Sequence, residues 1–191
     1  MTKIVIFISG RGSNMEAIIK EVNSGILMGI AEIVLVFSNN QEAAGLKIAE
    51  KNGISTAYIN SEGKNRKDYD NEVFEMIKNI DFDYIVLAGY MRILSEMFVS
   101  KYSKRIINIH PADTTKHQGL HAYKWAFKNK LSETKITVHY VDSGVDTGEI
   151  IAQANVDLRG AKTLAEFEKR GLAVEHKFYS ETLKSLFGNI N

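Results

Sequence analysis

Short apolar runs alternate with stretches of helical spacing along most of the chain. Strand-like runs occur at Ile4–Ile8, Ile33–Phe37, Tyr84–Ala88 and Arg105–Ile109, with a shorter candidate at Thr56–Ile59. Helical segments are predicted between them, at Met15–Val22, Glu42–Lys51, Arg66–Ile80 and Glu96–Tyr102. Strands that alternate with helices indicate βαβ units, and therefore a mainly parallel sheet covered by helices on both faces.

The pattern changes after Pro111. Ile136–Val141 alternates between apolar and polar residues, and Glu149–Leu158 is a candidate antiparallel partner for it; Ala122–Lys130 looks helical. The segment Thr163–Glu166 matches a capping box and predicts a long C-terminal helix that runs to about Phe187. We therefore predict an α/β fold of residues 1–191 as a single doubly wound, Rossmann-like domain, with an antiparallel C-terminal extension. Its ligand site is expected at the carboxyl edge of the parallel strands.

Composition narrows the function classes. The 191 residues carry a net charge of +1, which gives no overall attraction to nucleic acid or to an anionic membrane. The apolar run Ile4–Ile8 is far too short to span a bilayer. The absence of cysteine excludes disulfides, thiolate nucleophiles and cysteine-ligated zinc, and agrees with a reducing compartment. We expect a cytoplasmic protein that acts on small molecules.

The five histidines do not indicate a metal site. His117 and His121 are four residues apart, but Gly119 between them favours a loop, and no glutamate completes a zinc-binding motif. His139 lies in an alternating strand and is interpreted as a packed residue or as a partner to the site. His176, in the last predicted helix, is expected at the surface.

A glycine loop follows the first predicted strand. The segment Ser9–Asn14 reads Ser-Gly-Arg-Gly-Ser-Asn, and small residues there let the backbone approach an anion at the start of a helix. A dinucleotide loop is disfavoured because the third glycine position is Met15 and no acid follows the second strand. Two interpretations remain equally open. The loop is a phosphate or carboxylate cradle, or it is a tight turn with Ser13 or Asn14 as the helix N-cap.

The segment Ile106–Pro111 contains the clearest candidate catalytic residues. Asn108 and His110 are two residues apart in a strand, so their side chains point to the same side, and Pro111 ends the strand at the expected binding edge. Histidine transfers protons near neutral pH, and an asparagine amide can stabilise an oxyanion. The alternative interpretation is that the two polar residues have only a structural role at the end of the strand.

The loop Val141–Gly148 contains two acids and two glycines. An aspartate such as Asp146, if brought beside His110, would raise the basicity of the imidazole and fix its tautomer. From the residues alone, a turn acid that bonds its own backbone is the better interpretation of Asp146.

Together these segments resemble the folate-dependent formyltransferase family, in particular the glycinamide ribonucleotide formyltransferases of purine biosynthesis. The resemblance covers nearly the whole chain. The matching motifs are Ile8–Asn14, Val86–Leu94, Asn108–Pro111, Gly119–His121 and Val138–Gly148.

The resemblance implies a role for each matching residue. The catalytic residues it implies are Asn108, His110 and Asp146. It implies that the acceptor substrate is held by Gly12, Ser13, Asn14 and Glu175. It also implies that 10-formyltetrahydrofolate is the co-substrate, contacted by Arg66, Met91, Arg92, Ile93 and Leu94. No metal is implied.

One segment departs from the family pattern. The family continues from His-Pro with Ser-Leu-Leu-Pro, whereas Ala112–His117 is polar and includes Asp113. Because this loop borders the acceptor, formylation of another amine, such as an amino-sugar nucleotide, is the alternative function. A phosphometabolite-binding sensor without activity is the non-enzymatic one.

Overall fold

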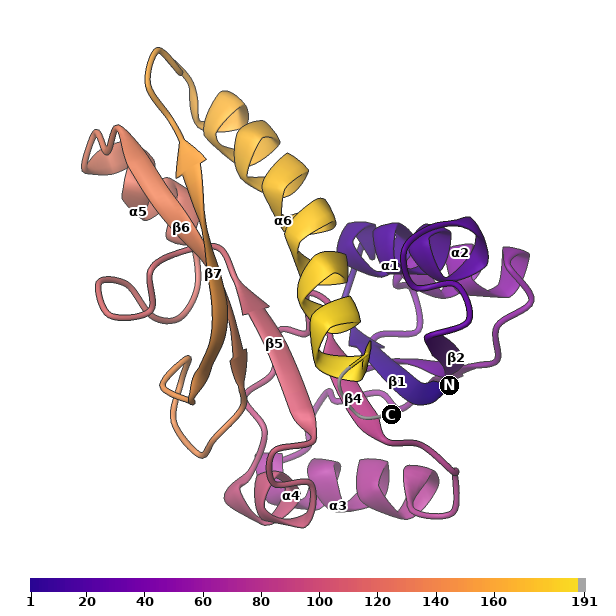
Figure 1. Cartoon of the computed structure of the whole chain (residues 1–191). Coiled ribbons are helices and arrows are strands. Elements are labelled where there is room, and N and C mark those ends of the chain that lie inside the picture. The colour runs from indigo at the N-terminus through magenta and orange to yellow at the C-terminus, as the bar shows by residue number, and fades with distance from the viewer. Residues whose placement is uncertain (189–191) are drawn as a thin grey trace.

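The computed structural model describes residues 1–188, in which seven strands form a single sheet flanked by six helices (Figure 1). The strands are β1 (Thr2–Ile8), β2 (Ala31–Ser38), β3 (Thr56–Tyr58), β4 (Tyr84–Leu87), β5 (Ile106–His110), β6 (Glu133–Tyr140) and β7 (Ile150–Asp157). The helices are α1 (Ser13–Ser24), α2 (Ala44–Lys51), α3 (Arg66–Ile77), α4 (Glu96–Lys101), α5 (Ala122–Lys128) and α6 (Leu164–Gly188).

The sheet has the predicted mixed topology. Its order is β3-β2-β1-β4-β5-β6-β7, parallel from β3 to β5, with β6 and β7 added antiparallel to their neighbours. Helices α1, α2 and α6 cover one face of the sheet, and α3 and α4 cover the other (Figure 1). The doubly wound fold, its antiparallel extension and the long last helix are therefore confirmed.

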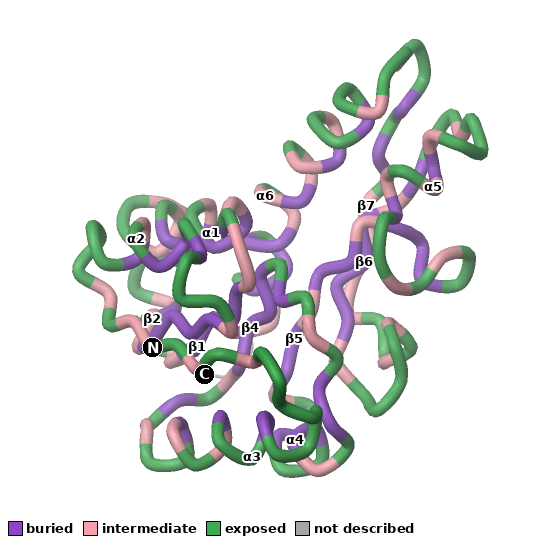
Figure 2. The backbone as a smooth tube through the Cα atoms, turned by 180° about the vertical axis from the view of Figure 1, so that it is seen from behind, coloured by how far each residue is buried: buried purple, intermediate pink, exposed green. Residues whose placement is uncertain are grey.

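The first strand is apolar from Ile4 to Ile8 because both of its faces are buried. Ile4, Ile6 and Ile8 belong to the core layer under α1 and α6, while Val5 and Phe7 belong to the layer under α3 and α4. Successive side chains point to opposite faces of a strand, and both faces here are covered. Figure 2 shows β1, β4 and β5 as buried along most of their length.

The start of the long helix has the predicted capping box. The Thr163 hydroxyl accepts a hydrogen bond from the backbone N–H of Glu166 at 3.2 Å, and the Glu166 carboxylate accepts one from the N–H of Thr163 at 3.1 Å. Such reciprocal bonds satisfy backbone donors that the first turn leaves free. No helix within residues 1–188 is both long and apolar enough to cross a bilayer.

The alternative in which Ser13 or Asn14 is the N-cap of the first helix is wrong. Gly12 precedes α1 with a φ of 77°, and no side chain caps the helix, so Ser13 and Asn14 are helical residues. A Cβ at Gly12 would lie 2.9 Å from the Cα of Gly45, at the start of α2. The glycine is therefore required both by its left-handed backbone and by the close approach of two helix starts.

The loops that follow β1 and β4 are joined at the carboxyl edge of the sheet. The Ser9 hydroxyl accepts a hydrogen bond from the backbone N–H of Met91 at 2.8 Å, and the N–H of Ser9 bonds the carbonyl of Gly89 at 3.2 Å. These strands flank the point where the winding of the sheet reverses, which is where open α/β sheets bind ligands.

Helix α6 is tied to the sheet by a buried tyrosine. The Tyr179 hydroxyl lies 3.1 Å from the carbonyl oxygens of both Leu87 and Ile107, on β4 and β5. Its ring has no exposed surface, and burial raises the pKa of its hydroxyl well above 10.0, so the group remains a donor.

Replacement of Tyr179 by phenylalanine is expected to lower the free energy of unfolding by about 1–3 kcal/mol, because buried carbonyl oxygens lose their donor. Urea titration followed by circular dichroism measures this change. Tyr58→Phe, at a half-exposed tyrosine, is the matched control and should leave the midpoint unchanged. Equal midpoints for the two variants would contradict the bridging role of Tyr179.

Candidate active site

The end of β5 presents two polar side chains beside β6. Asn108 is paired in register with His139, and His110 with Thr137. His110 is only 5% exposed and His139 only 2%, so both imidazoles are held within packed surroundings. The interpretation of His139 as a packed residue that also supports the site agrees with this placement.

The loop between β6 and β7 fixes Asp146 in an unusual backbone conformation. Asp146 has a φ of 52°, a left-handed value that aspartate tolerates better than most residues. A Cβ at Gly148 would lie 1.8 Å from the carbonyl oxygen of Tyr140, so only glycine fits there. The tight return to β7 turns the Asp146 side chain towards β5.

Four groups converge on the Asp146 carboxylate. Its Oδ2 accepts a hydrogen bond from the backbone N–H of Gly119 at 2.8 Å and lies 3.2 Å from Nδ1 of His110. Its Oδ1 lies 3.3 Å from the amide nitrogen of Asn108 and 3.5 Å from Nε2 of His139. The structure therefore brings the three predicted catalytic residues together, with Asn108 and His110 each in contact with Asp146.

The pKa values of the acid and the base follow from this arrangement. Burial alone would raise the pKa of Asp146, but the His139 contact, the charge of His110 and the Gly119 N–H together lower it, so the carboxylate is charged at neutral pH. Asp146 does favour protonated His110, as predicted. Burial outweighs it, and the pKa of His110 falls below 6.5. The predicted contribution of Asp146 is therefore present, and burial sets the net direction of the His110 pKa.

The nitrogen atoms of the site already have partners. Nε2 of His110 lies 3.2 Å from the carbonyl oxygen of His117, and Nδ1 faces the Asp146 carboxylate. Both partners only accept, so a neutral imidazole donates to one of them and the imidazolium to both. The two N–H groups of the Asn108 amide face Asp146 and, at 3.2 Å, Nε2 of His139. A substrate oxygen can receive hydrogen bonds from His110 or Asn108 only by exchange with these internal partners.

Asn108, His110 and Asp146, called here the catalytic triplet, line a pocket of about 300 Å³. Its wall is formed by Met91, Arg92, Ile93 and Leu94, with Leu120 and Val145 facing the same space. Met91 and Leu120 are more than half exposed, so an apolar rim continues from the pocket onto the surface. Within residues 1–188, no three His, Asp or Glu side chains are grouped as a metal site requires.

A second group of predicted residues joins α1 to α6. The Asn14 amide donates a 2.8 Å hydrogen bond to one carboxylate oxygen of Glu175, and the Tyr123 hydroxyl donates to the other. Asn14 and Glu175 are both buried, and the amide oxygen of Asn14 has no protein partner. These residues do not line the pocket of the triplet.

Tyr123 was not predicted from the sequence. Its only sequence signal is Gly171, a glycine inside a long helix, where a Cβ would lie 2.0 Å from the Tyr123 hydroxyl oxygen. Burial and the neighbouring Glu175 carboxylate raise the pKa of Tyr123, which keeps the hydroxyl protonated as a donor.

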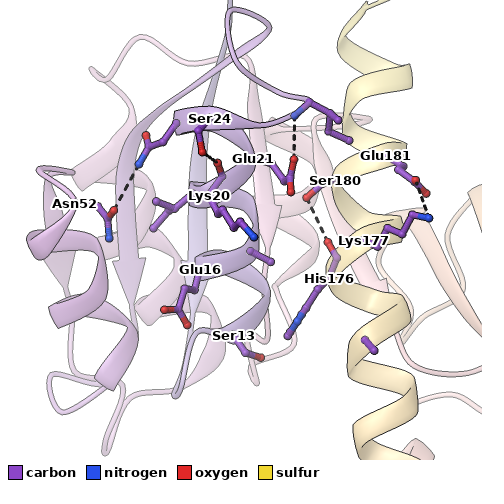
Figure 3. A pocket seen from close by; sticks show the side chains of 15 residues that line it. Ser13, Glu16, Lys20, Glu21, Ser24, Asn52, His176, Lys177, Ser180 and Glu181 are labelled. Atoms are coloured by element: carbon purple, nitrogen blue, oxygen red, sulfur yellow. Dashed lines mark hydrogen bonds and ion pairs between the residues drawn. The ribbon is translucent and has the colours of Figure 1, made fainter.

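Ser13 faces a different and larger space. A groove of about 790 Å³ lies between α1 and α6, with Ser13 and His176 towards one end (Figure 3). His176 was expected at the surface, but it is partly buried and its Nε2 has no hydrogen-bond partner. The groove contains none of the catalytic triplet, so the larger cavity is not the candidate active site.

Arg66 is not brought to the pocket. It is exposed in the first turn of α3 and is absent from the pocket lining, whereas Arg92 lies in the lining with its guanidinium 4.4 Å from the ring centre of Tyr69.

Charged and neutral hydrogen-bonding groups at the carboxyl edge of an α/β sheet, without a nucleophilic side chain, define a group-transfer site. Residues 2–183 match the formyl transferase family model, and the chain belongs to that family. It is 39% identical to phosphoribosylglycinamide formyltransferase from Escherichia coli (strain K12), over 92% of this chain and 82% of that protein.

Other relatives are longer or have known structures. The human trifunctional purine biosynthetic protein adenosine-3 is 37% identical over 95% of this chain, but the chain spans only 18% of its length and 12% of the related protein from Drosophila pseudoobscura pseudoobscura. The crystal structure of phosphoribosylglycinamide formyltransferase from Bacillus halodurans superposes with a TM-score of 0.93. The two sequences are 34% identical, and the match covers 100% of this chain and 97% of that protein.

Nuclear magnetic resonance titration of His110 is expected to give a pKa below 6.5, because burial disfavours the charged imidazole. In Asp146→Asn the pKa should fall further, because the negative charge that favours protonation is removed. Glu149→Gln, in an exposed ion pair beyond the loop, is the control and should not change the titration. A higher His110 pKa in Asp146→Asn would contradict the electrostatic role of Asp146.

Proposed function

We propose that this protein transfers the formyl group of 10-formyltetrahydrofolate to the amine of glycinamide ribonucleotide, as a step of purine biosynthesis in the cytoplasm. The observation that carries the proposal is the convergence of Asn108, His110 and Asp146 in one pocket with an apolar wall. The chain's membership of the formyl transferase family supports this chemistry.

The triplet is suited to each part of the transfer. The amine nitrogen attacks the formyl carbon, and the carbonyl electron pair moves onto oxygen, where N–H groups of His110 and Asn108 stabilise the negative charge. The ammonium proton passes to the Asp146 carboxylate, directly or through a water molecule. The oxyanion then re-forms the carbonyl as the bond from the formyl carbon to the folate nitrogen breaks, and that nitrogen takes the proton held by Asp146.

The two ends of the site suit the two substrates. A pocket of about 300 Å³ with an apolar wall fits a flat heterocycle, and the exposed rim at Met91 and Leu120 can carry the rest of the folate. We place the folate carboxylates towards exposed Arg66. We also propose that the loop from Gly12, at the start of α1, holds the phosphate of the acceptor through free N–H groups.

The acceptor's hydroxyl groups are placed against the buried pair of Asn14 and Glu175. Glu175 contributes carboxylate oxygens, and the unpartnered amide oxygen of Asn14 adds an acceptor. Ser13 extends the phosphate end of this surface towards the groove between α1 and α6.

Purified protein with both substrates is expected to produce the formylated ribonucleotide, followed spectrophotometrically as tetrahydrofolate is released. Asn108→Ala and His110→Ala should each lower kcat on the order of 10²–10³-fold, the usual cost of losing one donor to an oxyanion. Asn79→Ala, at an exposed asparagine outside the site, is the control. Absence of turnover by the wild type, or full turnover by His110→Ala, would reject the proposal. Rates measured with a panel of amines, including amino-sugar nucleotides, show which amine is the preferred acceptor.

Replacement of Tyr123 by phenylalanine is expected to raise the KM for glycinamide ribonucleotide while the KM for the folate stays unchanged. The physical reason is that the Glu175 carboxylate loses one of its two hydrogen-bond donors and with it its fixed orientation. Initial-rate kinetics with each substrate varied separately measure the two constants. Equal changes in both constants would show that Tyr123 does not act through the acceptor site.

A further inference from the structure

The loop that departs from the family pattern directs its acid away from the pocket. Asp113 is only 7% exposed and is absent from the pocket lining. Its Oδ2 lies 3.1 Å from the Nζ of Lys135, on β6. The change from apolar to polar residues in this loop therefore creates a contact with the antiparallel part of the sheet.

This ion pair is one side of a closed hydrogen-bonded ring. Lys135 also donates to the side-chain oxygen of Gln153, on β7, at 3.1 Å. The Gln153 amide donates to the Thr137 hydroxyl at 3.0 Å, and that hydroxyl donates to the carbonyl of Ala112 at 2.7 Å. We call these five residues, Ala112, Asp113, Lys135, Thr137 and Gln153, the loop anchor.

Asp113 also shapes the loop that follows it. Its Oδ1 accepts hydrogen bonds from the backbone N–H of Thr115 at 3.1 Å and from the Thr115 hydroxyl at 2.7 Å. Its carbonyl oxygen accepts from the N–H groups of Lys116 and His117. Burial would raise the pKa of Asp113, but the bonds from Thr115 and Lys135 lower it to about 2, so the carboxylate is charged at physiological pH.

The loop leads from this anchor to the catalytic groups. The carbonyl oxygen of His117 lies 3.2 Å from Nε2 of His110, and the N–H of Gly119 donates to Asp146 at 2.8 Å. The His117 ring stacks on Trp125 with ring centres 4.8 Å apart, which holds the middle of the loop against α5. Two backbone groups of one loop thus orient the imidazole and the carboxylate of the triplet.

We propose that the loop anchor positions the catalytic residues of this enzyme, with Asp113 and Lys135 as its positioning residues. The anchor fixes the loop against β6 and β7, and the fixed loop holds His110 and Asp146 through His117 and Gly119. The activity readout of this inference rests on the proposed formyl transfer, whereas its spectroscopic readout does not.

The test compares Asp113→Asn, Lys135→Met and the conservative Lys135→Arg in the full chain by amide-resolved nuclear magnetic resonance. In the first two variants, the Gly119 amide proton is expected to move upfield and to exchange faster with solvent, because its bond to Asp146 is loosened. Lys135→Arg should keep the wild-type signal, because the cation is retained. Asp157→Asn, in an exposed ion pair at the last residue of β7, is the matched control and should leave Gly119 unchanged.

Steady-state kinetics supply the second readout. Asp113→Asn and Lys135→Met should lower kcat on the order of tenfold to a hundredfold, the cost of displacing a catalytic group by about 1 Å, with little change in the KM for the folate. An unchanged Gly119 signal in both variants would overturn the inference, whatever happens to activity. A displaced Gly119 signal with unchanged kcat would also overturn it. If the wild type does not transfer formyl groups, the proposed function fails, and the Gly119 signal still decides whether the anchor orders the loop.

Discussion

The site depends on one carboxylate held in a left-handed backbone turn. Asp146 receives the N–H of Gly119 and faces Asn108, His110 and His139, so a single side chain contacts groups from two strands and one loop. Its orientation in turn depends on the return of the chain at Gly148, where no other residue fits. A buried charge is costly unless it is hydrogen-bonded and paired, and these contacts meet that requirement. Asp146 is therefore both a candidate catalytic residue and the residue that holds the other groups of the site together.

Local patterns in the sequence were sufficient to predict the architecture. The apolar run of β1 required cover on both faces of the sheet, and the capping box at Thr163 placed the start of α6 correctly. The strand alternation that paired Asn108 with His110 is a local property as well. The close approach of Gly12 to Gly45, more than thirty residues along the chain, has no local signal, so the interpretation of Ser13 or Asn14 as the N-cap could not be decided from the sequence.

The chemistry of the site was less accessible from the residues alone. The chain between His110 and Asp146 includes α5, β6 and the loops around them, and only the family resemblance predicted that the two residues meet. The attraction of Asp146 for protonated His110 could be anticipated from its charge, whereas the burial that exceeds it arises from the completed packing. Tyr123 was missed because its partners, Glu175 and Gly171, lie on a different helix. The catalytic role of the triplet and the substrate contacts remain predictions.

The contact between Asn14 and Glu175 has a consequence for folding. The two residues are 161 positions apart, yet they share a buried hydrogen bond. Contacts of such large sequence separation require most of the chain to be ordered before they form, because closing a long loop costs entropy before the contact repays it. Since domains acquire their structure as the chain emerges during synthesis, the hydrogen-bonded clamp between the first and last helices forms only after α6 has been made. A partly synthesised chain therefore lacks the buried contact between Asn14 and Glu175 until the last helix has emerged.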